Sequence, residues 1–106
     1  MSLILRFVCL AGFAFLAGAM AAEPVVGQKN KQFTEEALDV SAGTSVDFKN
    51  DDDVTHNIAV RDPNGANRPG IVQSPGTETR VAFTLLGDHD VRCLIHPKMK
   101  MKVRVN

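Results

Sequence analysis

The chain has 106 residues, which is room for one domain. Its 12 basic and 12 acidic residues balance, and this excludes the basic excess that a nucleic-acid-binding domain needs. The sequence contains no Trp and no Tyr, so the core must be built from aliphatic residues, methionine and phenylalanine.

The first 22 residues are typical of a secretory signal peptide. Arg6 precedes an apolar run at positions 7–19, and the small residues Ala21 and Ala22 follow that run. The alternative is a retained membrane anchor, but the run is shorter than the roughly 20 apolar residues that span a bilayer. We therefore predict that residues 1–22 are a signal peptide that is removed. Residues 23–106 then form one domain that is exported to the periplasm and does not enter a membrane.

The cysteine count limits how this domain can be stabilised. Cys9 lies in the predicted signal peptide, so Cys93 is the single cysteine of the mature chain. One thiol cannot form an internal disulfide, although small exported domains often rely on disulfides or a metal. In an oxidising compartment a lone cysteine is either a liability or occupied by a ligand.

After the signal peptide, short alternating segments separated by turn residues predict an all-β sandwich or barrel. The turns and loops fall at 41–44, 50–53, 61–70, 74–76 and 87–88. The apolar residues that alternate with polar neighbours are Leu38, Val40, Val46, Phe48, Ile58, Val60, Val81, Phe83, Val91, Met101, Val103 and Val105. No segment shows a sustained helical period.

The last two predicted strands fix the direction of several side chains, because residues two apart on a strand share a face. Val91 and Cys93 are expected to point inward together. Val103 and Val105 point inward as well, with Met101, and with Met99 if the strand begins that early. The basic residues between them, Lys100, Lys102 and Arg104, are expected to face solvent.

Between these strands lies the segment with the most specific chemistry. From Cys93 to Met101 the sequence reads CLIHPKMKM, so a thiol, an imidazole and two thioethers fall within nine residues. A second imidazole, His56, stands far upstream at the start of a predicted strand. Soft sulfur donors combined with imidazole suit copper, and two histidines and one cysteine with a weak axial methionine form an electron-transfer site. A β scaffold that holds such a site for both copper oxidation states moves little when an electron passes.

The residues from about Leu38 to Asn106 resemble the cupredoxins, the type 1 blue-copper family. Three features carry the resemblance: the pattern Cys-x-x-His-Pro-x-Met, the strand from Gly87 to Cys93, and the pair His56-Asn57 about 37 residues before Cys93. They are most like the amicyanin type, with plastocyanin and pseudoazurin next. The resemblance implies a Greek-key β-sandwich that binds one copper ion through His56, Cys93, His96 and a methionine.

Two methionines compete for the axial position. Met99 fits the short loop of the amicyanin type, and Pro97 supports that spacing. Met101 fits the longer loop of plastocyanin, but it also continues the inward stripe of Val103 and Val105. We favour Met99 as the ligand and core packing for Met101, since methionine commonly fills cores.

The resemblance also assigns roles to two further residues. It implies that Asn57 ties its strand to the copper loop by hydrogen bonds, outside the ligand set. His89 stands where the family pattern usually has tyrosine, and four residues of strand separate it from Cys93, about 13 Å at ~3.3 Å per residue. We therefore interpret His89 as structural.

The function that the resemblance implies is a diffusible carrier of single electrons and not an enzyme. Its donor would be a dehydrogenase or cytochrome and its acceptor a cytochrome or oxidase, each docking transiently where His96 emerges. Pro97, Lys98 and Lys100 surround that place, and lysines there can steer an acidic redox partner. Nothing in the sequence demands an oligomer, so we expect a monomer.

Two other functions stay open. The methionines Met99 and Met101 also suit a periplasmic copper chaperone or store, which would pass its copper rapidly to a chelator and show little colour. A metal-free β-sandwich used for binding would leave Cys93, His56 and His96 as unrelated residues, and their spacing argues against this.

Overall fold

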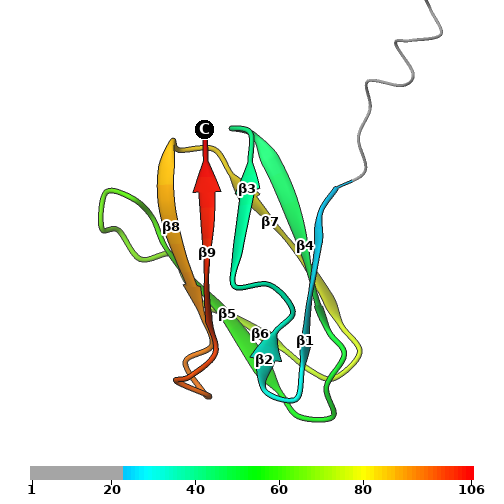
Figure 1. The fold of residues 1–106 in the computed structure, drawn as a ribbon. Coiled ribbons are helices and arrows are strands. Elements are labelled where there is room, and N and C mark those ends of the chain that lie inside the picture. Colours follow the sequence, from blue (N-terminus) through cyan, green and yellow to red (C-terminus); the bar gives the residue numbers. More distant parts are fainter. Residues whose placement is uncertain (1–22) are drawn as a thin grey trace, which may run out of the picture.

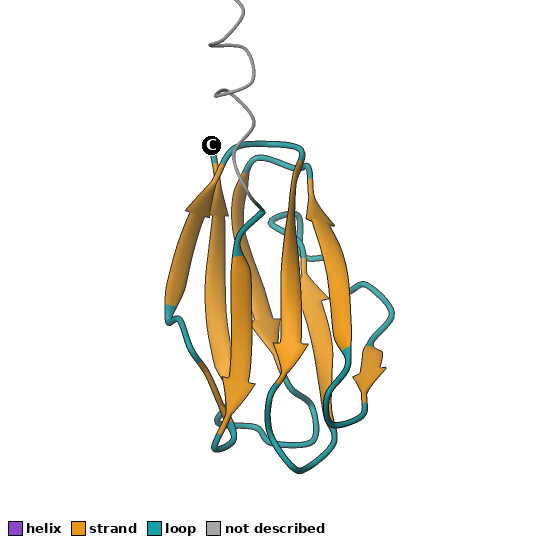
Figure 2. Ribbon diagram, turned by 90° about the vertical axis from the view of Figure 1, so that its right-hand side faces the viewer, coloured by secondary structure: helices purple, strands orange, loops and turns teal. Residues whose placement is uncertain are grey.

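The structure is a computed structural model that describes residues 23–106. Within this range the chain forms nine strands and no helix (Figure 2). No helix in the described part is therefore long and apolar enough to cross a membrane. The strands are β1 (Val25–Lys29), β2 (Gln32–Phe33), β3 (Ala37–Val40), β4 (Thr44–Asn50), β5 (His56–Arg61), β6 (Ile71–Gln73), β7 (Glu78–Phe83), β8 (Gly87–Arg92) and β9 (Lys100–Val105). The predicted signal peptide lies outside the described residues.

The strands form two sheets that face each other (Figure 1). One has the order β2-β1-β4-β7 and the other β3-β9-β8-β5-β6. Consecutive strands often lie in different sheets, because the chain crosses between the sheets after β2, β3, β4, β6 and β7. β1 pairs parallel with β4, and β3 pairs parallel with β9. The predicted all-β Greek-key sandwich is confirmed.

The space between the sheets is filled by apolar side chains. The buried cluster consists of Val26, Val40, Val46, Phe48, Ile58, Val60, Val81, Phe83, Val91, Met101, Val103 and Val105. Removing such side chains from water is the main force that holds a sandwich together. Met101, Val103 and Val105 of β9 point into this core, and Lys100 and Arg104 face solvent as predicted. Lys102, also predicted to face solvent, is half-buried.

Three strands were not expected from the sequence. β1 and β2 precede the first alternating segment, and β6 is the three-residue stretch between two predicted turns. β6 shows no alternation because Ile71 and Val72 are both exposed and only Gln73 is buried. β1 forms through pairing with β4, β2 through pairing with β1, and β6 through pairing with β5. A local sequence pattern cannot reveal such pairing.

One arrangement in the second sheet brings distant residues together. β5 and β8 are antiparallel neighbours, with Ala59 opposite Arg92. The start of β5 therefore lies beside the end of β8, which places His56 next to Cys93. The loop that joins β8 to β9 lies at the same end of the sandwich (Figure 1).

Candidate metal centre

Three predicted ligand side chains converge at this end of the sandwich. The Nδ1 atoms of His56 and His96 lie 3.1 Å apart, and they lie 3.8 and 3.7 Å from the Sγ atom of Cys93. The point equidistant from these three atoms is about 2 Å from each, a distance that matches the bonds of about 2.0–2.3 Å between a metal such as zinc and imidazole nitrogen or thiolate sulfur. The three side chains thus form a pocket of donors that fits one metal ion.

The donors come from two different parts of the scaffold. His56 is the first residue of β5 and is fully buried, while Cys93 directly follows β8 and is also buried. His96 lies in the loop between β8 and β9 and is half-buried. Two backbone hydrogen bonds close this loop: Met99 N donates to His96 O at 2.9 Å, and Cys93 N donates to Met99 O at 3.1 Å. The backbone of the loop itself therefore holds it in a compact turn.

Asn57 connects the strand of one donor to the loop of the others. Its backbone N–H points to Cys93 Sγ at 3.3 Å, and its side-chain Oδ1 accepts a hydrogen bond from Leu94 N at 2.7 Å. The first contact places a donor on the sulfur, and the second holds the backbone just after it. Hydrogen bonds of this kind orient metal ligands and tune the metal they bind.

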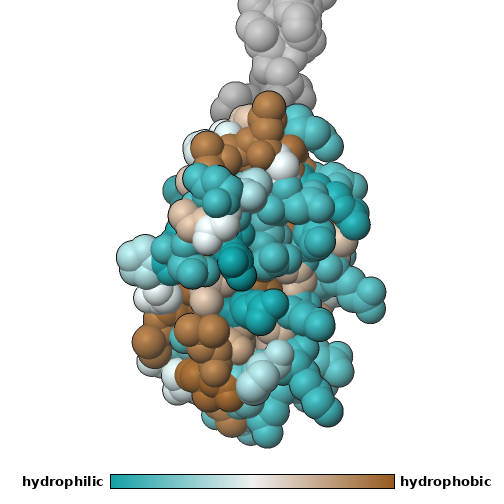
Figure 3. Space-filling model, turned by 90° about the vertical axis from the view of Figure 1, so that its left-hand side faces the viewer, coloured by the Kyte–Doolittle hydropathy of each residue, from teal (hydrophilic) through white to brown (hydrophobic). Residues whose placement is uncertain are grey.

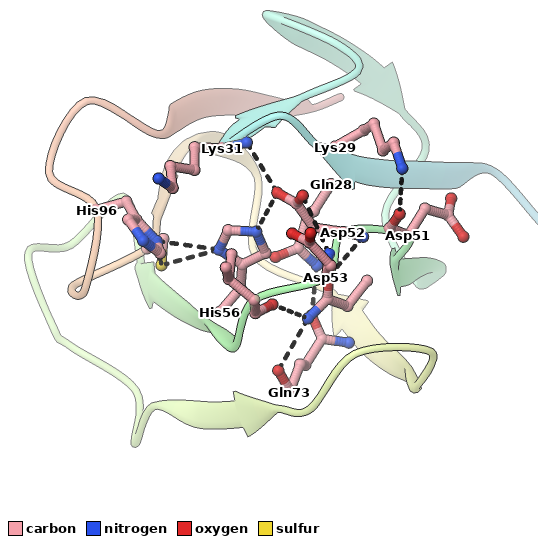
Figure 4. Close-up of polar contacts among 12 residues, drawn as sticks. Gln28, Lys29, Lys31, Asp51, Asp52, Asp53, His56, Gln73 and His96 are labelled. Atoms are coloured by element: carbon pink, nitrogen blue, oxygen red, sulfur yellow. Dashed lines mark hydrogen bonds and ion pairs between the residues drawn. The ribbon is translucent and has the colours of Figure 1, made fainter.

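Asp52 fixes which nitrogen of His56 carries its proton. Asp52 Oδ2 lies 2.9 Å from His56 Nε2 (Figure 4), whereas Cys93 Sγ lies 3.8 Å from the other ring nitrogen, Nδ1. A carboxylate there keeps the proton on Nε2, so Nδ1 of the neutral ring presents a lone pair to the other two donors. The Nδ1 atom of His96 lies 3.1 Å from this lone pair, within hydrogen-bond distance, so either a proton on His96 Nδ1 or a metal ion can occupy the space between the two nitrogens. His56 therefore offers an electron pair to a cation at this point.

The position of Asp52 is itself fixed by its surroundings. Lys31 N, in the turn between β1 and β2, donates to Asp52 Oδ2 at 2.8 Å, and the Asn50 side chain accepts from Asp52 N at 2.9 Å. The Lys31 hydrogen bond, and after it the bond to His56, hold the pKa of Asp52 well below its ordinary value. The carboxylate therefore remains charged beside the ring. Sequence reasoning noticed Asp52 only as part of an acidic run, in which no sequence pattern distinguishes it from Asp51 or Asp53.

The two methionines occupy different surroundings. Met99 and Cys93 are both buried, yet neither belongs to the apolar cluster between the sheets. Met101 is a member of that cluster. Packing in the apolar cluster is enough to explain a methionine at position 101. Met99 instead lies at the end of the donor loop, where its backbone forms hydrogen bonds with both Cys93 and His96.

The remaining predicted residues lie around or away from this centre. Pro97, Lys98 and Lys100 are exposed. Leu94 and Ile95, in the same loop, are also exposed, and Figure 3 shows apolar side chains gathered at the lower end of the molecule, where this loop lies. His89 is buried against the ring of Phe83, with centroids 5.1 Å apart, and is not part of the donor group.

Comparison with known proteins agrees with this geometry. The profile of the family described as copper binding proteins, plastocyanin/azurin family, matches residues 21–106. Among curated protein sequences, none matches the chain.

Many solved structures share the fold. Amicyanin from Paracoccus versutus is 25% identical with a TM-score of 0.73, over 85% of this chain and 87% of that protein. The Cu(I) form of an amicyanin mutant gives the same identity and TM-score, over 85% and 89% of the two chains. A purple cupredoxin from Nitrosopumilus maritimus is 25% identical with a TM-score of 0.65, over 79% of this chain and all of the other.

The family match covers the whole described domain, the neighbouring structures have the same sandwich, and the donor set is the one that copper prefers. The chain therefore belongs to the plastocyanin/azurin family of copper-binding proteins, the cupredoxins.

Proposed function

We propose that this protein is an exported type 1 copper protein that carries single electrons between periplasmic redox proteins. In this proposal His56, Cys93 and His96 hold the copper, and Met99 is the weak axial ligand. Copper supplies the chemistry by alternating between Cu(I) and Cu(II). The observation that carries the proposal is that all three strong donors already converge within 4.8 Å of one another.

The residues around the donors support electron transfer rather than transport of the metal. His56 is held by Asp52, and the loop is closed by its own backbone bonds and by Asn57. A site fixed in this way changes little with oxidation state, which keeps the barrier to electron transfer low. A chaperone or store needs sulfur donors that a receiving site can reach, whereas the thioethers of Met99 and Met101 are both buried.

We further propose that partners dock at the loop end of the sandwich. The half-buried His96 is the donor nearest to solvent there, and exposed Leu94, Ile95 and Pro97 offer apolar contact around it. Lys98 adds a positive charge in the loop that can steer an acidic partner. Donors of the dehydrogenase or cytochrome class and acceptors of the cytochrome or oxidase class fit this role.

The central test loads the domain of residues 23–106 with Cu(II) and records its visible and electron paramagnetic resonance spectra. We expect an intense sulfur-to-copper charge-transfer band, narrow copper hyperfine splitting and reversible reduction. Cys93→Ser should bind Cu(II) without the band. A colourless wild-type complex that loses its copper rapidly to a chelator would favour the chaperone or store instead.

Steering is tested separately with the anionic reductant hexacyanoferrate(II). Lys98→Glu should slow reduction of the Cu(II) protein at low salt, with the difference vanishing at high salt. Arg104→Glu makes the same charge change on an exposed residue at the far end of β9 and is the control. Equal effects of the two variants would show that only the net charge matters.

A further inference from the structure

We propose that a pocket on the outer face of the second sheet binds carboxylate groups presented by an acidic redox partner. This pocket has a volume of about 350 Å³. It lies between β5, the segment at 67–70 and the two residues that flank Cys93. The side chains that matter here are Ala59, Arg61, Arg68, Arg92 and Leu94. That the partner is a redox protein rests on the proposed function; the carboxylate chemistry does not.

The strand register places two arginines around a small floor. Ala59 of β5 is paired with Arg92 of β8, and Arg61 lies two residues further along β5 on the same outward face. Arg61 and Arg92 are thus diagonal neighbours on adjacent strands, which lie about 7–8 Å apart at their Cα atoms. Ala59 and Asp90 occupy the other two corners of this set of four residues. Their like charges repel unless an anion lies between them.

The carboxylates nearby do not neutralise this pair. Asp62 is engaged by Arg68, whose Nε donates to Asp62 Oδ1 at 3.0 Å and whose guanidinium also donates to Ala82 O at 2.8 Å. Asp90 is opposite Arg61 in the register. Across residues 23–106, however, neither Arg61 nor Arg92 has a carboxylate oxygen within 4.0 Å. Arg68 is therefore held in place as one side of the pocket. The guanidinium groups of Arg61 and Arg92 form no ion pair within the described domain and can bind a carboxylate.

Carboxylate is the chemistry that this arrangement selects. A guanidinium group offers two parallel N–H donors that match the two oxygens of a carboxylate, and charge-assisted bonds of this type are strong. Leu94 is 64% exposed at the rim and adds apolar contact. Arginine and apolar side chains together are typical of protein interfaces. The occupant is therefore a protein surface that presents Asp or Glu side chains.

The pocket also lies where docking is useful for the proposed function. Arg92 and Leu94 are the chain neighbours of Cys93, the sulfur donor. Lys100 is the strand partner of Arg92, so positive charge continues from the pocket toward the lysines of the loop. A partner that places an acidic edge in the pocket rests beside the sulfur side of the centre and can still reach the loop.

The test uses a tetraglutamate peptide as the carboxylate probe and the isotope-labelled Cu(I) protein. Nuclear magnetic resonance titration should give saturable amide shifts centred on Ala59, Arg61, Arg92 and Leu94. The double variant Arg61→Gln/Arg92→Gln should weaken binding by about tenfold or more, because it removes two charge-assisted contacts. Both side chains are exposed, and the same spectra show that the fold is kept.

The control double variant Lys49→Gln/Arg80→Gln removes the same charge from the other sheet and should weaken binding by less than about twofold. Equal weakening by both variants, shifts centred on Lys98 instead, or the same shifts with inorganic phosphate at equal concentration would overturn the proposal. The readout needs no electron transfer. A missing blue colour would therefore refute the proposed function alone, and an unresponsive pocket would leave the copper assignment intact.

Discussion

Asp52 and His56 form a carboxylate–imidazole pair in which the bonded nitrogen, Nε2, lies on the opposite side of the ring from the nitrogen that faces Cys93. The pair acts on the metal centre through the ring. It fixes the tautomer, holds the ring direction and places a negative charge behind one donor. A positive metal centre is stabilised by that charge, and Cu(II) more than Cu(I).

Replacing this carboxylate is expected to raise the reduction potential. Asp52→Asn removes the charge but keeps an oxygen that can accept the Nε2 proton, so Cu(II) loses stabilisation relative to Cu(I). The shift should be on the order of 50–100 mV upward, measured by voltammetry of the copper-loaded protein. Asp53→Asn is the matched control, because Asp53 is exposed and only its backbone N–H contacts Asp52. Equal shifts in the two variants would contradict a role for the ring contact.

The axial ligand is assigned by substituting the two methionines separately. Met99→Gln should lower the potential by tens of millivolts, because an amide oxygen is a harder donor that favours Cu(II), and Met99→Leu should raise it. Met101→Leu should leave potential and spectra unchanged and cost less than about 1.5 kcal/mol of unfolding free energy, as for a volume-conserving core change. A spectral change with Met101→Leu but none with Met99→Gln would reverse the assignment.

The sequence predicted the parts of the fold whose residues alternate regularly. In β9 every second residue is buried from Met101 to Val105, so the side-chain period of a strand was visible without any partner. β6 shows the opposite case, since its buried residue, Gln73, is polar. Gln73 can be buried because its side chain donates to Phe48 O at 2.9 Å and to Thr79 Oγ1 at 3.0 Å. Both partners lie on strands of the other sheet, and Phe48 is 25 residues away in the sequence.

The residues of the candidate site also fall into two groups: those that the sequence identifies and one that only the folded loop identifies. Cys93, His96 and Met99 lie in one short segment, and the pair His56-Asn57 has a recognisable spacing from it, so the sequence could nominate all of them. Asp52 could not be assigned, because three consecutive aspartates are equivalent as a string. Only the loop conformation, set by Asn50 and the Lys31 amide, decides which of them faces His56.

The turn between β1 and β2 contains a residue whose backbone strain can be relieved by a substitution. Lys31 has a φ of 57°, in the left-handed region that favours glycine. Lys31→Gly keeps the backbone N–H that donates to Asp52 and removes the steric cost of a side chain there. We expect the free energy of unfolding to rise by about 0.5–1 kcal/mol in denaturant titrations. Lys29→Gly should instead lower it, because Lys29 is the last residue of β1 and its Nζ donates to Asp51 O at 3.0 Å. A loss of stability with Lys31→Gly would show that the backbone of Lys31 is not strained.

The outer face of the first sheet contains a pair of carboxylates whose repulsion can be measured. Asp47, by hydrogen bonding and by its charge, raises the pKa of Glu78 even though Lys49 lies 4.0 Å away. A carboxyl whose pKa is raised on folding stabilises the fold below its unfolded pKa and loses that contribution as pH rises through the folded pKa. Glu78→Gln should therefore raise the melting temperature at pH 7 by roughly 1–2 °C and have no effect at pH 3.5, where Glu78 is protonated. Glu35→Gln makes the same charge change on an exposed residue and is the control. If Glu78→Gln lowers the melting temperature at pH 7, the attraction between Glu78 and Lys49 is stronger than the repulsion between Glu78 and Asp47.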